Sequence, residues 1–163
     1  MDIVIVFQAV ITGISATFIM DLWSLFQKHI IHVPPLNYGL VGRWFLWMFR
    51  GKFRHNTILS TASVDKEFFI GWVLHYLIGV LFAFIPLLLQ GLNWFCEPSL
   101  ITAILVGLLT LSAPFIIMQP AFGFGFAASR TPRPWLARIL GILTHLMYGL
   151  GLYIIVIFIN SLE

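Results

Sequence analysis

Four long apolar stretches, separated by polar segments rich in charge, proline or glycine, dominate the pattern of the chain. They cover approximately residues 3–26, 68–92, 99–118 and 136–160. A helix needs about 20 apolar residues to cross the roughly 30 Å hydrocarbon core of a bilayer. None of the stretches shows the short polar and apolar alternation that a membrane β-barrel requires. The pattern therefore predicts an all-α membrane protein with four transmembrane helices.

The first stretch is expected to remain in the protein as a span. A secretory signal has a basic region at its start and a cleavage site with small residues at its end. This stretch has no such basic region and no such site before Asp21 and Trp23, so we do not expect it to be a secretory signal. We expect a single integral membrane domain over residues 1–163, with long loops at residues 27–67 and 119–135.

The placement of charge predicts how the spans are oriented. The opposite side of the membrane from the two loops would carry only Asp2, Glu97 and Glu163. All nine basic residues lie at the end of span one, in the first loop, or between spans three and four: Lys28, Arg43, Arg50, Lys52, Arg54, Lys66, Arg130, Arg133 and Arg138. The positive-inside rule then makes both loops cytoplasmic and places both termini outside. This topology also accounts for the net charge of +3, so no nucleic-acid partner is expected.

Aromatic and basic residues interleave in the first loop, which predicts a basic amphipathic segment lying in the membrane interface. The residues expected to contact lipid or a partner are Arg43, Trp44, Trp47, Arg50, Lys52 and Arg54. The expected partners are the lipid bilayer with its anionic headgroups, and either a membrane protein or a second copy of the chain in a homodimer. The remaining loop residues His29, His32, His55, Asp65 and Glu67 are interpreted as a solvated loop.

The pattern G-x-x-x-H-x-x-x-G occurs twice, at Gly71–Gly79 and at Gly141–Gly149. A second short likeness, "SATFIM" from Ser15 and "SAPFII" from Ser112, accompanies it. Together they predict a parallel duplication of a two-helix unit. The glycines Gly71, Gly79, Gly141 and Gly149 are expected to be helix-packing positions, because small residues let membrane helices approach closely.

Four polar residues, one from each span, predict a polar site in the cytoplasmic half of the bundle. They are Asp21, His75, His145 and Gln119. A carboxylate at membrane depth costs roughly 2.5 kcal/mol or more unless it is paired, protonated or wetted. Three interpretations of the histidine pair stay open: polar helix packing, a proton-transfer site with Asp21, or two axial ligands to a b-type haem.

Motifs for enzymatic chemistry are absent from the sequence, and no catalytic residue is assigned. There is no HExxH element, no cysteine-rich metal motif, no G-x-S-x-G elbow and no phosphate-binding Walker loop. The single cysteine, Cys96, leaves no intrachain disulfide to form.

Six ordered sequence elements resemble the bacterial DUF2938 family of small membrane proteins. They are "MDLW" at Met20, "YGLVGRW" at Tyr38, "RGKFRH" at Arg50, "GWVLHYLIG" at Gly71, "APFIIMQPAFGFGFAASRTPRP" at Ala113 and "HLMYGLGLY" at His145. The resemblance implies a bacterial inner-membrane protein without an assigned activity. From the polar residues within the spans we expect a non-enzymatic transport or membrane-accessory protein, with a haem-binding redox protein or a scaffold for a membrane complex as alternatives.

Overall fold

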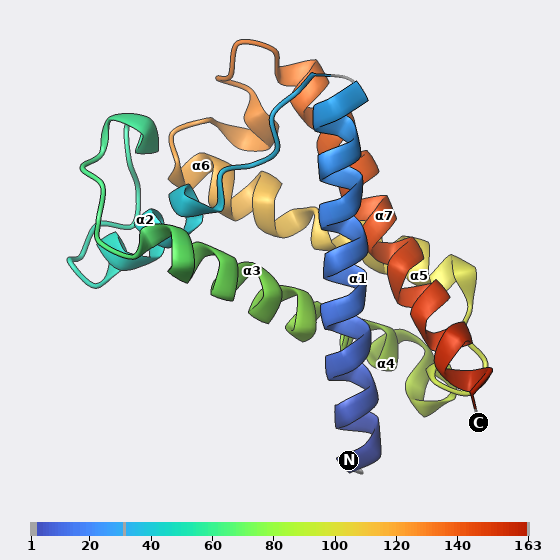
Figure 1. Cartoon of the computed structure of the whole chain (residues 1–163). Helices are drawn as coiled ribbons and strands as arrows, with labels where there is room; N and C mark the ends of the chain where they lie inside the picture. The colour runs from blue at the N-terminus through green and yellow to red at the C-terminus, as the bar shows by residue number, and fades with distance from the viewer. Residues whose placement is uncertain (1–2, 31, 163) are drawn as a thin grey trace. The chain divides into compact units, whose positions relative to one another are not determined.

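The structure is a computed structural model that describes residues 3–30 and 32–162, and these residues form helices and loops without a strand. Figure 1 follows them along the chain. The α-helices are α1 (Ile3–Ile30), α2 (Tyr38–Met48), α3 (Glu67–Phe82), α4 (Ile85–Gln90), α5 (Leu100–Thr110), α6 (Gln119–Ala121) and α7 (Pro134–Asn160). Short 3-10 helices are η1 (Ile58–Ser60), η2 (Gly91–Trp94) and η4 (Phe126–Ala128), while η3 (Ala113–Met118) is a π-helix. Asp2 and Glu163, assigned to the outer side above, lie outside the described residues.

Four helical segments are long and apolar enough to cross a membrane, which confirms the predicted fold class. They are Ile3–Ile30, Glu67–Trp94, Leu100–Ala121 and Pro134–Asn160. The largest difference from the predicted boundaries is at the end of the first helix, which continues to Ile30. Lys28 lies in its last turn, where a cation interacts favourably with the helix dipole and so stabilises the helix past the apolar stretch.

The chain divides into two compact units. Unit 1 contains residues 1–35, 76–110 and 142–163, and unit 2 contains residues 36–75 and 111–141. Helices α3 and α7 therefore each contribute residues to both units. Each unit has its own buried cluster, and each is described by itself below.

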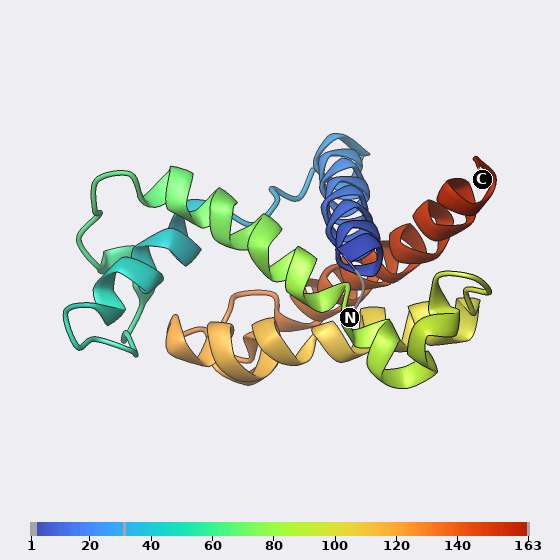
Figure 2. The same cartoon turned by 90° about the horizontal axis from the view of Figure 1, so that it is seen from below.

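Unit 1 is built on close contacts between helices at small residues. Ala16 of α1 lies against Gly151 of α7, and Ala9, Ala83 and Ala103 are fully or almost fully buried. Small side chains bring the backbones together, and Trp94 and Leu152 fill the remaining space. At the end of α3 the chain bends before Pro86, and α4, η2 and α5 fold back beside one another (Figures 1 and 2).

Unit 2 packs the short helix α2 against the first part of α3. Gly42 and Gly71 lie where the two backbones meet: a Cβ on Gly42 would collide with the Glu67 carbonyl, and one on Gly71 with the Tyr38 carbonyl. Figure 2 shows α2 beside the beginning of α3. The cluster beneath them contains Leu40, Val41, Ile58 and Phe122.

Two backbone hydrogen bonds fasten the first loop to the end of the third span within unit 2. The His55 N–H donates to the Ala121 carbonyl at 2.8 Å, and the Ile58 N–H donates to the Phe122 carbonyl at 2.9 Å. The same region contains Gly123, whose Cβ position would overlap the Asn56 carbonyl and whose φ is +84°. Only glycine combines that close approach with a left-handed backbone, so this position joins the two segments.

The third span changes its helical geometry in the middle. Residues 113–118 form a π-helix, in which the Gln119 N–H donates to the carbonyl of Pro114, five residues earlier. Proline has no N–H and crowds the preceding turn, which favours such an interruption. The structure therefore has a wider helical turn at Pro114.

Candidate functional site

The carboxylate of Asp21 in α1 accepts a hydrogen bond from Tyr76 of α3. Tyr76 OH lies 3.0 Å from Asp21 Oδ2, and both side chains are half-buried in unit 1. The bond joins residues 55 positions apart in a chain with few intramembrane charges. A carboxylate inside a membrane-spanning helix is costly unless it has a polar partner. The Tyr76 hydroxyl is such a partner for Asp21.

Small residues on both helices explain why Tyr76 reaches Asp21. One and two turns before Asp21, Thr17 lies against Gly79 and Gly13 lies against the backbone of Val80. A Cβ on Gly13 would come within 2.6 Å of Val80 Cα, so a larger residue there would separate the helices. The stripe Gly13–Thr17–Asp21 therefore sets the separation of α1 from α3 at the carboxylate.

Further hydrogen bonds in this part of unit 1 join neutral groups. Thr17 Oγ1 donates to the Gly13 carbonyl at 2.7 Å within its own helix. Tyr148 of α7, which is 2% exposed, donates to the Gly79 carbonyl at 2.6 Å. The buried tyrosine thus joins α7 to α3 at the same glycine that Thr17 approaches.

His145 lies beside a threonine of α5. Its Nδ1 is 2.8 Å from Thr110 Oγ1, and that hydroxyl also donates to the Gly107 carbonyl at 2.7 Å. Because the one hydroxyl proton is directed to Gly107, the imidazole carries its proton on Nδ1 and donates it to Thr110. One turn along α7, Gly149 lies against Ala103 and Gly107, so α5 and α7 are in close contact around the histidine.

His75 has aromatic neighbours in unit 2. Its ring stacks on Tyr38 with 4.0 Å between ring centroids and 23° between planes, and Trp72 presents an edge at 5.9 Å. Tyr38 is the first residue of α2, and Asn37 caps this helix by accepting the Gly39 N–H at 2.9 Å. The start of α2 therefore supplies the surface on which His75 lies.

Gln119 follows the π-helix in unit 2. Its Oε1 is buried and has no hydrogen-bond partner among the described residues. A similar glutamine occurs in unit 1, where Gln27 Oε1 accepts from Thr144 at 3.5 Å while Nε2 is buried without a described partner. Unpaired buried amides are uncommon, and a bound water or solute at either one would supply the missing partner.

The four residues of the predicted polar site divide between the units. Asp21 and His145 belong to unit 1, whereas His75 and Gln119 belong to unit 2. The glycines of the repeated pattern divide in the same way, with Gly79 and Gly149 in unit 1 and Gly71 and Gly141 in unit 2. Each therefore has a local environment of its own.

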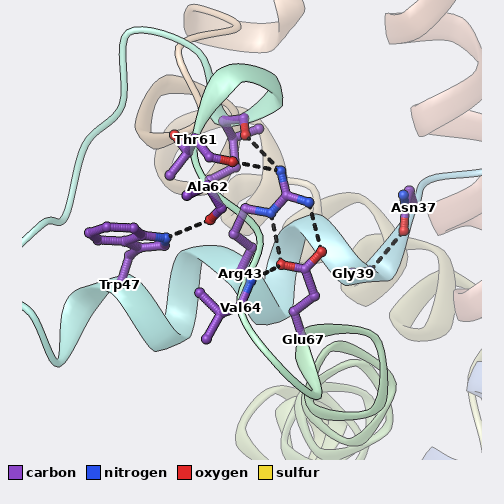
Figure 3. A network of polar contacts seen from close by, with 9 residues as sticks. Asn37, Gly39, Arg43, Trp47, Thr61, Ala62, Val64 and Glu67 are labelled. Atoms are coloured by element: carbon purple, nitrogen blue, oxygen red, sulfur yellow. Dashed lines mark hydrogen bonds and ion pairs between the residues drawn. The ribbon is translucent and has the colours of Figure 1, made fainter.

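A network around Arg43 holds the first loop of unit 2 together (Figure 3). Arg43 Nε donates to Glu67 Oε2 at 2.8 Å and Nη2 donates to Oε1 at 2.6 Å, in a bidentate pair whose side chains are 14% and 17% exposed. Nη1 donates to the Ile58 and Thr61 carbonyls at 3.2 and 3.0 Å. Hydrogen bonding to Glu67 raises the pKa of Arg43 above its ordinary value, although burial opposes this.

The contact between Gly42 and Gly71 explains the position of this ion pair. Arg43 follows Gly42 on α2, and Glu67 is one turn before Gly71 on α3, so the close approach of the glycines brings the charges together. Glu67 Oε2 also accepts the Val64 N–H at 2.9 Å, which fixes the chain entering α3. Arg43 therefore pairs with Glu67 within unit 2, and its contact with lipid or a partner stays a prediction.

The tryptophans of the loop bond to its own backbone. Trp44 Nε1 donates to the Phe53 carbonyl at 2.9 Å, and Trp47 Nε1 donates to the Ala62 carbonyl at 3.0 Å. Arg50 and Lys52 lie over the Trp47 ring, 4.8 and 5.4 Å from its centroid. These cation–π contacts hold two of the loop's cations near one indole.

The interpretation of His55 as part of a solvated loop is wrong. Its side chain is 5% exposed, and its Nδ1 lies 2.8 Å from Thr61 Oγ1, which donates to the Thr57 carbonyl. Nε2 is buried and has no partner among the described residues. Burial, and next the charge of Lys52, lower the pKa of His55, so the folded loop favours the neutral imidazole.

The sequence analysis found the residues at the centre of these contacts, but it did not find the residues that form hydrogen bonds with them. It identified Asp21, His145 and Arg43 but not Tyr76 and Thr110, and it assigned Glu67 to a solvated loop and not to an ion pair with Arg43. A tyrosine within an apolar span was the available signal for Tyr76, because its hydroxyl needs a partner when it is buried. No group of three or more histidines, cysteines or acidic residues in the described ranges lies close enough to hold a metal ion.

Helices of this length and apolarity define a multi-pass membrane protein. The chain belongs to the family described as "Protein of unknown function (DUF2938)", whose sequence model matches residues 10–159, and this confirms the resemblance noted from the sequence. No curated protein and no solved structure matches the chain.

Proposed function

We propose that this is a bacterial inner-membrane protein with a non-enzymatic transport role, in which the Asp21 carboxylate binds and releases a proton. The observation that supports the proposal is the hydrogen bond between Asp21 and Tyr76 in unit 1. Ionisable residues inside a membrane are costly, and they are found where ions or protons move.

The chemistry of this pair suits reversible protonation. When Asp21 is ionised, the Tyr76 hydroxyl stabilises the carboxylate by donating to Oδ2 at 3.0 Å. When Asp21 is protonated, its carbonyl oxygen still accepts from the same hydroxyl, so neither state leaves the tyrosine unpaired. The carboxylate is half-buried, and the proposal requires that water reach its exposed part.

The first experiment measures the protonation itself. Infrared difference spectra of the protein in membranes are recorded through a pH titration for the wild type and for Asp21→Asn. We expect a protonated-carboxyl band that is absent from Asp21→Asn and shifted in Tyr76→Phe, because the hydroxyl bonds to this group. The other acidic residues also contribute carboxyl bands, so the assignment would be contradicted if the titrating bands of Asp21→Asn matched those of the wild type.

The second experiment measures proton uptake by liposomes that contain the protein and a trapped pH indicator. A membrane potential drives the uptake. The measurement is repeated with different mixtures of candidate solutes, because the transported substrate is not identified. Asp21→Asn should abolish proton uptake, whereas Asp21→Glu, which keeps a carboxylate, should retain part of it. The unfolding midpoint of each variant in detergent serves as the control. Equal loss of folded protein and of flux in Asp21→Asn would favour a purely structural role for this residue.

A further inference from the structure

A pocket of about 310 Å³ opens on the first loop of unit 2. It is formed by a single stretch of chain between the end of α2 and the turn after η1. The residues lining it are Trp47, Lys52, Arg54, Asn56, Thr57, Ser60, Thr61 and Ala62. Its volume is near the lower end of the roughly 300–1,000 Å³ typical of small-molecule sites.

The charge of this pocket is positive and uncompensated. Lys52 and Arg54 line it, both are exposed, and neither forms an ion pair with a residue that the structure describes. None of the lining residues is acidic. The nearby carboxylate of Glu67 is bidentate to Arg43, so it does not neutralise these cations. The pocket therefore attracts anions.

Hydroxyl groups supply neutral hydrogen-bond donors beside the two cations. Thr57 Oγ1 accepts the Leu59 N–H at 3.4 Å, which leaves its own proton to donate. Ser60 Oγ donates to the Thr57 carbonyl at 3.2 Å and turns to another acceptor by rotation about one bond. Asn56, whose side-chain amide carries two N–H donors, also lines the pocket. Cations together with hydroxyl and amide donors match the several acceptor oxygens of a phosphate group.

Hydrogen bonds from Arg43, which is outside the lining, and from Trp47, which is part of it, hold the pocket in shape. Arg43 fixes the Ile58 and Thr61 carbonyls, and Trp47 donates to the Ala62 carbonyl. The Trp47 ring also lies 5.4 Å from Lys52 Nζ, which keeps the ammonium at the pocket. A site ordered before binding loses less conformational freedom when the ligand arrives.

We propose that this pocket binds a phosphate group, supplied either by a phospholipid headgroup or by a soluble phosphate compound. Lys52 and Arg54 pair with the phosphate oxygens, while Thr57, Ser60 and Asn56 complete the coordination. In the sequence, the residues of the pocket follow one helix of membrane-spanning length, α1, and precede the next, which begins with α3. Basic and aromatic residues beside membrane helices meet the lipid headgroups, so both sources of phosphate are within reach.

The test compares the two sources on the intact protein. In mild detergent, calorimetry measures binding of inorganic phosphate. In nanodiscs of phosphatidylcholine alone or mixed with phosphatidic acid, native mass spectrometry measures retained lipid. Saturable binding of inorganic phosphate supports a soluble phosphate ligand, and selective retention of phosphatidic acid alone supports a headgroup.

The decisive variants neutralise cations at different positions in the loop, and their effects are compared per charge removed. Replacing both pocket cations, Lys52→Gln with Arg54→Gln, should weaken binding roughly a hundredfold, on the basis of about tenfold for each charge-assisted contact. Arg50→Gln is the matched control, because Arg50 is exposed in the same loop, lies over Trp47 and does not line the pocket. It should change the affinity by less than about threefold.

Two outcomes would overturn the proposal. One is an equal loss of binding per charge in Arg50→Gln, which would show a diffuse basic surface instead of a pocket. The other is the absence of binding in both the phosphate and the phosphatidic acid measurements. Since Lys52 and Arg54 are exposed, the unfolding midpoint of the double variant should match the wild type, so a loss of binding does not reflect unfolding.

Discussion

The histidines of the repeated glycine pattern have different neighbours. His145 in unit 1 donates to a threonine hydroxyl at 2.8 Å, whereas His75 in unit 2 stacks on a tyrosine ring at 4.0 Å. The flanking glycines differ as well, because Gly149 lies against a backbone in α5 and Gly141 faces only the ring of Phe115. The same sequence pattern therefore surrounds the two histidines with different environments, a polar one for His145 and an aromatic one for His75.

The difference extends to the units around the histidines. In unit 1, small residues bring helices into contact and neutral groups bond across them, with Asp21 as the exception. In unit 2, a bidentate ion pair and aromatic side chains organise a short helix and a long loop. Apolar helices associate through close packing, whereas a long loop with little regular secondary structure needs specific polar contacts to take one conformation.

The largest effect is expected from alanine at the first glycine of each pattern. Gly71→Ala places a methyl group into the Tyr38 carbonyl and must separate α2 from α3, at a cost of about 2–3 kcal/mol. Gly141→Ala meets Phe115 Cε1 at 3.2 Å, and a small ring movement offset by better helix propensity should leave stability within about 1 kcal/mol. Unfolding midpoints in mild detergent measure both, and equal losses would contradict this comparison.

The ion pair of unit 2 gives the next effect. Glu67→Gln removes the charge that faces a guanidinium only 14% exposed and should lower the free energy of unfolding by about 2 kcal/mol. Asp65→Asn is the control, because Asp65 is exposed in the same loop and should change stability by less than about 0.5 kcal/mol. If the two variants unfold alike, the pair does not organise the loop.

A smaller effect separates the two histidines. Thr110→Val keeps the shape of the side chain but removes the acceptor of the His145 proton, at a cost of about 1 kcal/mol. Nitrogen chemical shifts of the imidazoles measure the change. They should move for His145 and stay constant for His75, whose neighbours are aromatic. A change at His75 alone would contradict the hydrogen-bond assignment.

The smallest effect is a pH dependence in unit 2. Burial lowers the pKa of His55, so the unfolded chain binds a proton at a higher pH than the folded loop does. The stabilisation is complete above a pH of about 6.5 and is lost as the pH falls below it. Hydrogen exchange of the loop amides at about pH 7.5 and about pH 5.5 should show faster opening at the lower pH. His55→Asn should reduce this difference, and an unchanged difference would assign it to another group.

The four spans and their approximate ends were predictable because hydropathy and length constrain a membrane helix strongly. The fold of the loop between α1 and α3 was not, since it depends on Arg43 meeting Glu67 across 24 residues of chain. From its pattern, a loop rich in charged and aromatic residues is predicted to lie on a surface. The pattern does not show that Gly42 and Gly71 bring the charges of Arg43 and Glu67 into contact.

The candidate site was predictable in part. Asp21 was recognisable because a carboxylate inside an apolar span is costly, but its partner was not, because helical phase does not tell which neighbouring helix a residue faces. Haem ligation by His75 and His145, the duplication, the orientation of the termini and the inner-membrane location stay predictions. A visible absorption spectrum of the purified protein, with His75→Ala and His145→Ala, tests the first of them.

The π-helix at residues 113–118 has a consequence for comparing this chain with its relatives. A π turn holds one residue more than an α turn, as if a single residue had been inserted between Ser112 and Gln119. Every side chain beyond the insertion is rotated by about 100° relative to an uninterrupted α-helix. The segments "SATFIM" in α1 and "SAPFII" in the third span therefore have similar sequences, but their side chains point in different directions around the helix axis. Relatives should be aligned with a one-residue gap at this turn wherever they lack the proline, and a deletion there would turn Gln119 to another face of its helix.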